Sequence, residues 1–254
     1  MDAVRRAVRC ALVVIGVAVT ALAGPGNTSL AAVAPTNPDY AVAKVQPTPG
    51  RTVGVAHPVV VTLTKPIADR AAFERTFRVL SPEDATGRFD WIKDDTVQWI
   101  PDRFWPAHSQ VTMLVAGAPL TFETGSAVVG VADISAHTFT VSIDGQVARV
   151  MPASMGKPSR PTPVGSYSVL EKDRSVEMDS RTIGIPLSSP EGYDIIAQYA
   201  ERITSSGVYV HSAPWSLDSQ GNANVSHGCI NLSPDNAAWY YDVVHVGDPV
   251  IVQP

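Results

Sequence analysis

Cysteine is scarce in this sequence: its 254 residues include two, Cys10 and Cys229. Cys10 lies in the N-terminal segment that we expect to be an export signal, so the exported chain would keep Cys229 alone. A single thiol cannot form an internal disulfide, which excludes a fold held together by such bonds. Many free cysteines are small buried hydrophobic residues, and a nucleophile is the alternative to weigh against that role.

Basic residues are also few. Lysine and arginine number 19 against 24 aspartates and glutamates, which gives a net charge of −5 at pH 7. Residues 1–34 contain three arginines and one aspartate, so removing them would leave a net charge of −7. Because contacts of lysine and arginine with phosphate drive nucleic-acid binding, this balance argues against a nucleic acid as a partner.

The apolar run near the N-terminus, residues 10–23, is short for a membrane helix. It has 14 residues, follows Arg5, Arg6 and Arg9, and ends at the GPGN sequence of residues 24–27. A membrane-spanning helix needs about 20 apolar residues, whereas this pattern is typical of an export signal. We therefore expect residues 1–34 to be a signal peptide, or alternatively a retained membrane anchor. Either would place the protein in the periplasm or cell envelope, secreted or held at the outer face of the cytoplasmic membrane.

Turn-separated apolar runs predict two β-rich domains after this leader. The proline-rich composition of residues 35–50 predicts a linker, and the pattern of residues 51–123 predicts an immunoglobulin-like β-sandwich. Its expected strands are residues 59–64, 77–80, 96–100 and 111–115. Residues 126–253 predict a second domain, so the fold class is mainly β.

Local signals in the second domain predict a hairpin, a long loop and one short helix. Asp144-Gly145 is a two-residue hairpin turn between alternating apolar residues. Residues 178–193 show little periodicity, and such a stretch is often a lid or binding loop. Ser233 and Pro234 predict a helix start, with residues 237–244 as its body and Gly247 at its end.

Two histidines are candidates to activate Cys229, since a thiolate nucleophile needs a base or a cation nearby. His211 ends a strand-like run, from which a base can project towards the thiol, and we assign the base to it. His227 is two residues before the cysteine, and we expect it mainly to shape the loop. The backbone N–H groups of Gly228 and Cys229 are candidate oxyanion donors, and Asn231 could orient a substrate amide. An open zinc site of His211, His227 and Cys229 is the competing interpretation, although the spacing matches no paired ligand motif.

The stretch Ser226-His227-Gly228-Cys229-Ile230-Asn231, together with His211, resembles the signature of the L,D-transpeptidase (YkuD-type) family. Residues 151–157, 178–180 and 211–215 are similar to the mycobacterial members. The order of signal or anchor, immunoglobulin-like domain and catalytic domain is also similar. The resemblance covers nearly the whole mature chain and implies a YkuD-type fold with a short helix after the cysteine.

The resemblance implies a reaction on peptidoglycan stem peptides. Cys229 would attack the carbonyl of the third residue, a diaminopimelate, in a tetrapeptide donor and expel D-alanine. The amine of a diaminopimelate in a neighbouring stem would then resolve the thioester and create a cross-link between two third-position residues. His211 would generate the thiolate and shuttle the proton, and the backbone carbonyl of Ser212 would help to hold its ring.

The resemblance also assigns the rest of the site. His227 and Gly228 would contribute to the oxyanion hole, and Met178 and Tyr193 would lie on a lid over the donor pocket. Ser206, Gly207 and Asn231 would contact substrate. Carbapenem-type β-lactams would acylate Cys229, and no metal or organic cofactor is implied.

Other functions remain open on the sequence alone. With the same nucleophile, water as acceptor would make the protein an L,D-carboxypeptidase, and a protein amine would make it a protein-to-peptidoglycan attachment enzyme. A zinc hydrolase and a non-catalytic wall-binding protein are the alternatives from other classes. An intact pair of His211 and Cys229 argues against the last of these.

Overall fold

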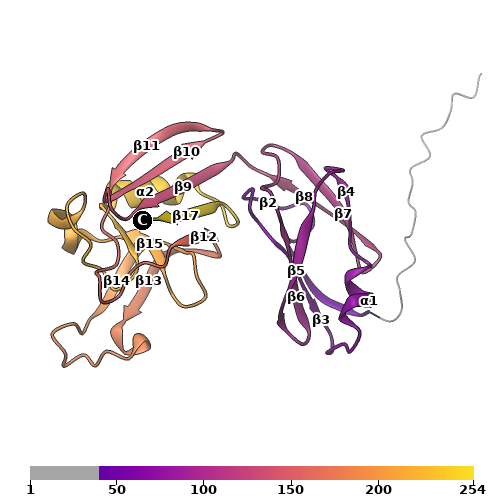
Figure 1. Ribbon diagram of the computed structural model, residues 1–254, viewed down its shortest axis with the longest axis horizontal. Helices are drawn as coiled ribbons and strands as arrows, with labels where there is room; N and C mark the ends of the chain where they lie inside the picture. Colours follow the sequence, from indigo (N-terminus) through magenta and orange to yellow (C-terminus); the bar gives the residue numbers. More distant parts are fainter. Residues whose placement is uncertain (1–39) are drawn as a thin grey trace, which may run out of the picture. The chain divides into compact units, whose positions relative to one another are not determined.

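The computed structural model describes residues 40–254 (Figure 1). The predicted signal or anchor, residues 1–34, lies outside the described residues. Among the residues described, no helix is long and apolar enough to cross a membrane. The chain is mostly β-strand, which confirms the predicted fold class.

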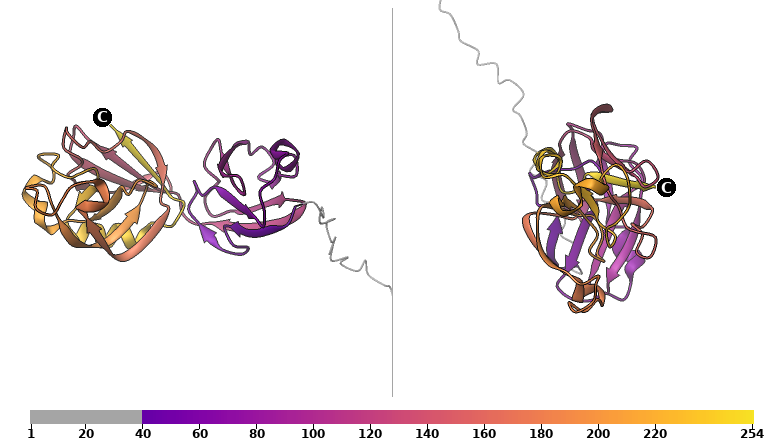
Figure 2. Two further views of the ribbon diagram at one scale, coloured as in Figure 1. Left: turned by 90° about the horizontal axis from the view of Figure 1, so that it is seen from below. Right: turned by 90° about the vertical axis from the view of Figure 1, so that its left-hand side faces the viewer.

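The N-terminal region is a sandwich of two four-stranded sheets, with strand orders β1-β3-β6-β5 and β2-β8-β7-β4 (Figures 1 and 2). Val59 and Val61 of one sheet share a buried core with Val111 and Met113 of the other. These residues alternate with more exposed ones, as expected of strands that bury one face. The strands are β1 (Val42–Gln46), β2 (Thr52–Val53), β3 (Val59–Leu63), β4 (Arg78–Ser81), β5 (Gly87–Lys93), β6 (Thr96–Pro101), β7 (Gln110–Val115) and β8 (Ala118–Thr124).

The predicted linker, residues 35–50, is wrong in part. β1 falls inside it and pairs antiparallel with β3, so residues 42–46 belong to the first sheet. Most side chains of β1 are exposed, so the strand lacks the apolar alternation that marks a buried face. The prolines around it, Pro38 and Pro47, gave the stretch the composition of a linker.

The C-terminal region contains a five-stranded sheet of order β11-β10-β9-β17-β12 and a four-stranded sheet of order β13-β14-β15-β16. β9 pairs parallel with β17, which follows α2 in the chain. The first sheet comprises β9 (Val128–Asp133), β10 (Thr138–Ile143), β11 (Gln146–Pro152), β12 (Gly165–Ser168) and β17 (Pro249–Gln253). The second comprises β13 (Glu171–Asp179), β14 (Asp194–Arg202), β15 (Tyr209–Ser212) and β16 (Ile230–Leu232).

Helix α2 (Pro234–Val243) follows β16 directly and is started by the predicted residues. The hydroxyl of Ser233 accepts a hydrogen bond from the Asn236 N–H at 3.4 Å, and Pro234 occupies the first turn. The helix ends at Val243, earlier than the predicted Gly247. It contacts β14 and β15 and buries Tyr240 completely, so it anchors the strands that carry the predicted site.

The irregular part of the expected lid is shorter than the predicted stretch of residues 178–193. Met178 lies in β13, and Tyr193 immediately precedes β14. The register pairs Met178 with Ile195, so both predicted lid residues, Met178 and Tyr193, lie at the same end of the β13–β14 strand pair. The irregular connection between these strands, which we call the lid segment, is residues 180–193. It begins with the 3-10 helix η1 (Ser180–Ile183).

Candidate active site

A cleft of about 660 Å³ in the C-terminal region gathers nearly all the predicted site residues. It contains Cys229 and His211 together with residues of the lid segment and of the loop before β16. The predicted residues that line it are Met178, Tyr193, Ser206, Gly207, His211, His227, Gly228, Cys229 and Asn231. Ser212 lies beside the cleft and is buried.

Parallel pairing of β15 with β16 closes the 18-residue separation between His211 and Cys229. The register places His211 opposite Asn231 and Val210 opposite Ile230. Cys229 immediately precedes β16, so its side chain emerges at the start of the strand beside the one that carries His211. Val210 and Ile230 are fully buried, and their packing holds the two strands in this register.

The His211 ring is held in one tautomer. Its Nδ1 lies 2.8 Å from the carbonyl oxygen of Ser212, and the residue is 3% exposed. A carbonyl oxygen only accepts, so Nδ1 donates and Nε2 is left without a proton. Burial lowers the pKa of His211 to about 4, which keeps the imidazole neutral and able to accept a proton at neutral pH.

The Cys229 thiol is half-buried and neutral at rest. Its Sγ lies 3.9 Å from the carbonyl oxygen of Gly207. Burial raises the pKa of Cys229 to about 11, against a smaller lowering by a backbone hydrogen bond from Tyr209. Thiol and imidazole are therefore both uncharged at pH 7, and Nε2 of His211 suits a base that takes the thiol proton as the sulfur attacks.

The turn before Cys229 is closed by two hydroxyl groups that the sequence analysis did not single out. Ser226 Oγ donates to the Cys229 carbonyl at 2.6 Å and accepts from the Gly228 N–H at 3.1 Å. Thr162 Oγ1 donates to the Gly228 carbonyl at 2.8 Å and accepts from the Gly156 N–H at 2.9 Å. Gly228 has a φ of 126°, which a side chain would strain. Since its N–H already donates to Ser226, an oxyanion role for that group requires this hydrogen bond to open.

Comparisons with known proteins match both regions of the chain. A model of the L,D-transpeptidase catalytic domain (YkuD) matches residues 127–252, and a model of a bacterial Ig domain matches residues 18–118. L,D-transpeptidase 1 of Mycobacterium tuberculosis is 58% identical over 248 residues, which cover 98% of this chain and 99% of the relative.

The chain belongs to the L,D-transpeptidase family.

Solved structures of other family members agree with this membership. The LD transpeptidase LdtMt1 in complex with imipenem superposes with a TM-score of 0.81 at 61% identity, covering 84% of this chain and 99% of the other. L,D-transpeptidase 3 from M. tuberculosis in complex with a faropenem-derived adduct gives 0.80 at 57% identity, covering 84% and 98%. This protein is therefore an enzyme of the L,D-transpeptidase family with an immunoglobulin-like domain before its catalytic domain.

His227 of this L,D-transpeptidase contacts the lid segment. Its ring centroid lies 5.1 Å from that of Tyr193, and its Nε2 lies 3.4 Å from Lys157 Nζ and 3.8 Å from the Glu191 carboxylate. Burial lowers the pKa of His227, and the charge of Lys157 lowers it further. His227 therefore lies between Lys157 and two residues of the lid segment, and its expected role in shaping the loop stays a prediction. Lys157 and Glu191 were not singled out from the sequence, because no local signal pairs residues 34 positions apart.

Asn231, which lines the cleft, has a buried side-chain acceptor without a partner in the described part of the chain. It is 3% exposed, and its Nδ2 donates to Ser216 Oγ at 3.1 Å. Its Oδ1 is buried and has no hydrogen-bond partner among residues 40–254. A buried acceptor without a partner is unfavourable, so this oxygen is suited to receive an N–H group from a ligand.

The zinc interpretation finds no supporting geometry in the described part of the chain. Residues 40–254 contain no group of three or more histidine, cysteine, aspartate or glutamate side chains placed to hold a metal ion. Nδ1 of His211 is already engaged by Ser212.

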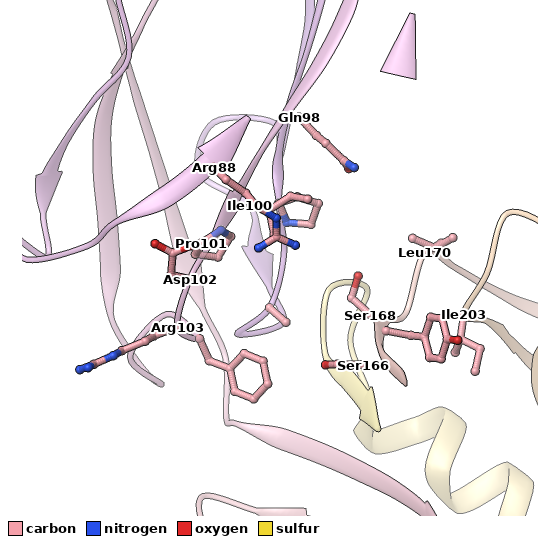
Figure 3. Close-up of a pocket in the computed structure, with 14 residues that line it drawn as sticks. Arg88, Gln98, Ile100, Pro101, Asp102, Arg103, Ser166, Ser168, Leu170 and Ile203 are labelled. Carbon is pink, nitrogen blue, oxygen red and sulfur yellow. The ribbon is translucent and has the colours of Figure 1, made fainter. Parts of the chain in front are cut away.

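A second cavity, of about 640 Å³, contains none of the predicted site residues. It is lined by residues of β5, β6 and β12 and of the loop after β6 (Figure 3). Arg88, Asp102 and Arg103 are its charged residues, and neither a cysteine nor a histidine lines it. It therefore lacks the nucleophile and base that the first cleft combines.

Proposed function

We propose that this enzyme is a peptidoglycan L,D-transpeptidase that joins two third-position diaminopimelate residues through a thioester on Cys229. The observation that supports this most directly is the pair of Cys229 and His211, brought into one cleft by adjacent parallel strands. The tautomer of His211 leaves its Nε2 free to take a proton. Such a pair is the minimum set for acyl transfer to a thiol.

The first half-reaction breaks the amide bond between diaminopimelate and the terminal D-alanine. Cys229 Sγ attacks the diaminopimelate carbonyl carbon as the thiol proton passes to Nε2 of His211. When the carbon–nitrogen bond breaks, that proton goes to the departing amine, and D-alanine leaves. A thioester between Cys229 and the donor stem remains.

The second half-reaction returns the enzyme to its starting state. The side-chain amine of a diaminopimelate in a neighbouring stem attacks the thioester carbonyl, and His211 accepts the amine proton. The carbon–sulfur bond then breaks, the proton returns to the sulfur, and a new amide bond joins the two stems. Because Ser212 orients the His211 ring through its carbonyl, one tautomer serves both half-reactions.

The cleft provides matching contacts for a peptide donor. Asn231 Oδ1 has no hydrogen-bond partner among the described residues, and Met178, Tyr193, Ser206 and Gly207 line the walls of the cleft that contains Cys229. We assign the donor stem to these walls. The oxyanion would be received by the backbone at Gly228 and Cys229, with His227 shaping the loop.

We further propose that carbapenem-type β-lactams acylate Cys229. Relatives at 61% and 57% identity have been solved with imipenem and with a faropenem-derived adduct. A strained lactam carbonyl meets the same requirements as the stem amide, namely a thiol, a base and oxyanion donors. The predicted leader would carry the enzyme to the cell envelope, where both peptidoglycan and such inhibitors are encountered.

Mass spectrometry of the intact protein tests the nucleophile. Incubation with a carbapenem should add one inhibitor mass to the unmutated protein and none to Cys229→Ala. An equal adduct on Cys229→Ala, or no adduct on the unmutated protein, would contradict the thioester mechanism. A chelator should leave acylation unchanged.

Product analysis tests the acceptor. A defined tetrapeptide stem should yield a cross-linked dimer and free D-alanine. A tripeptide as the sole product would indicate an L,D-carboxypeptidase. Transfer to a protein amine in place of a stem would indicate an attachment enzyme.

A further inference from the structure

The backbone of Lys157 is bonded to the turn before Cys229. Its backbone N–H donates to the Ser226 carbonyl at 3.0 Å, and Gly156 forms a β-bridge with Ser226. Thr162, at the other end of this loop, donates to the Gly228 carbonyl. The loop and the turn before Cys229 are therefore one hydrogen-bonded unit, and the Lys157 backbone is tied to the turn that precedes the nucleophile.

The partner of this ammonium belongs to the lid segment. Lys157 Nζ forms an ion pair with the Glu191 carboxylate, and the two side chains are 22% and 45% exposed. Glu191 also lines the catalytic cleft. The well-covered cation, Lys157, is thus on the loop that is bonded to the turn before Cys229. The more exposed anion, Glu191, is on the irregular connection between β13 and β14.

The charges around this ion pair are unequal. Arg160 is close enough to act on both Glu191 and His227, lowering the pKa of each in addition to the effect of Lys157. Lys157 and Arg160 supply two positive charges, whereas Glu191 supplies one negative charge. The three side chains therefore keep a net positive charge beside Glu191, which lines the cleft, and this charge favours an anionic ligand.

We propose that Lys157, assisted by Arg160, is a carboxylate-binding subsite for the donor stem, and that Glu191 occupies this subsite until a substrate carboxylate replaces it. The proposal rests on the proposed function, because the donor stem supplies the anion. Leaving a largely covered ammonium without a partner is unfavourable, so the group that displaces Glu191 must itself be an acceptor of matching charge. A carboxylate meets this requirement, and an amide meets it much less well.

The donor stem has two carboxylates near the bond that is cleaved. One is the terminal carboxylate of D-alanine, and the other is on the side chain of the third-position diaminopimelate. The shared chemistry is a carboxylate within reach of Cys229. Three synthetic tetrapeptide stems separate the sources: one with both groups free, one ending in D-alaninamide, and one with the diaminopimelate side chain amidated.

The binding of each stem is measured by the protection of Cys229 from iodoacetamide, followed by intact mass, which requires no turnover. For the free stem we expect Lys157→Met to raise the dissociation constant roughly tenfold. Glu191→Gln should lower it several-fold, because the competing carboxylate is gone. The stem in which an amide replaces the recognised carboxylate should have the same dissociation constant for all variants. Lys157→Arg, which keeps the charge, should restore binding of the free stem.

The opposite direction of the two effects is the decisive feature. If the ion pair only held the lid segment in place, Lys157→Met and Glu191→Gln would change binding in the same direction. Any one of three results would overturn the subsite: effects of the two substitutions in the same direction, equal binding of all three stems to the unmutated enzyme, or no protection by any stem. Arg181→Gln is the matched control, since Arg181 pairs with Asp179 and Asp194 at the start of the lid segment. It should leave every constant unchanged.

Failure of the proposed function would look different. Protection by the free stem that depends on Lys157, without any cross-linked product in the product analysis, would keep the subsite and reject the transpeptidase reaction. Cross-linking with equal use of free and amidated stems would keep the reaction and reject the subsite.

Discussion

The Thr162 hydroxyl should contribute several kilocalories per mole to the free energy of unfolding of the catalytic domain. Thr162 is 2% exposed, and its hydroxyl accepts from the Gly156 N–H and donates to the Gly228 carbonyl. Thr162→Val keeps the shape of the side chain but leaves two buried backbone groups without a partner. Each such group costs about 1–3 kcal/mol, so the two together should lower the free energy of unfolding by about 2–6 kcal/mol.

The same substitution should slow the reaction of Cys229. Gly228 directly precedes the nucleophile, and releasing its carbonyl frees the turn that positions the sulfur. A displacement of about 1 Å in a catalytic group lowers rates by up to about 100-fold. We expect the second-order rate constant for carbapenem acylation to fall by tenfold or more. Urea unfolding followed by circular dichroism measures the first effect, and intact mass against time measures the second.

Two controls give this prediction a clear outcome. Thr162→Ser retains the hydroxyl and should keep most of the stability and rate. Thr182 is exposed and donates to the Asp179 carbonyl at 2.6 Å, so Thr182→Val should change stability by less than about 0.5 kcal/mol. A Thr162→Val protein that matches Thr182→Val in both measurements would refute the reasoning.

Three further predictions concern the thiol, a buried acid and the core. Because burial raises the pKa of Cys229 to about 11, direct alkylation by iodoacetamide should accelerate with rising pH until about pH 11; a plateau near pH 8 would contradict this. Glu201 is fully buried, its carboxylate has no hydrogen-bond partner among the described residues, and burial raises its pKa well above the usual value. The native state therefore keeps a proton that the unfolded chain releases, so stability should fall as pH rises above about 4.5. Glu201→Gln should remove this fall in urea unfolding, whereas the exposed Glu177→Gln should not. Phe139 is fully buried against Tyr240 at 4.9 Å between ring centroids, so Phe139→Ala should cost about 3–5 kcal/mol in thermal or urea unfolding; a loss below 1 kcal/mol would contradict that packing.

Features that depend on a few neighbouring residues were predictable. The Asp144-Gly145 turn has positive φ at both positions and joins β10 to β11, as the two-residue hairpin signal predicts. Ser233 and Pro234 start α2 because the cap and the first turn are formed within four residues. The signature around Cys229 and the distant His211 indicated the family, and the sequence and structural comparisons confirmed it.

Features that depend on strand pairing were harder to predict. β1 is an edge strand with mostly exposed side chains, so only its pairing with β3 separates it from a linker. The end of α2 was misplaced because Val244 already has an extended backbone conformation, three residues before the glycine expected to end the helix. Likewise, the sequence did not show where β13 ends and where β14 begins. Only the pairing register of the two strands defines these boundaries.

The sequence by itself was sufficient to identify the family and to propose its chemistry here: one thiol outside the predicted leader, a histidine within reach, and a glycine that lets the turn form. The tertiary structure decided which groups act on that thiol. Parallel pairing of β15 with β16 places His211 beside Cys229, and the Ser212 carbonyl selects the tautomer. Folding also pairs Lys157 with Glu191, which lines the cleft. Contacts between residues tens of positions apart depend on strand register and burial, which no short sequence pattern encodes.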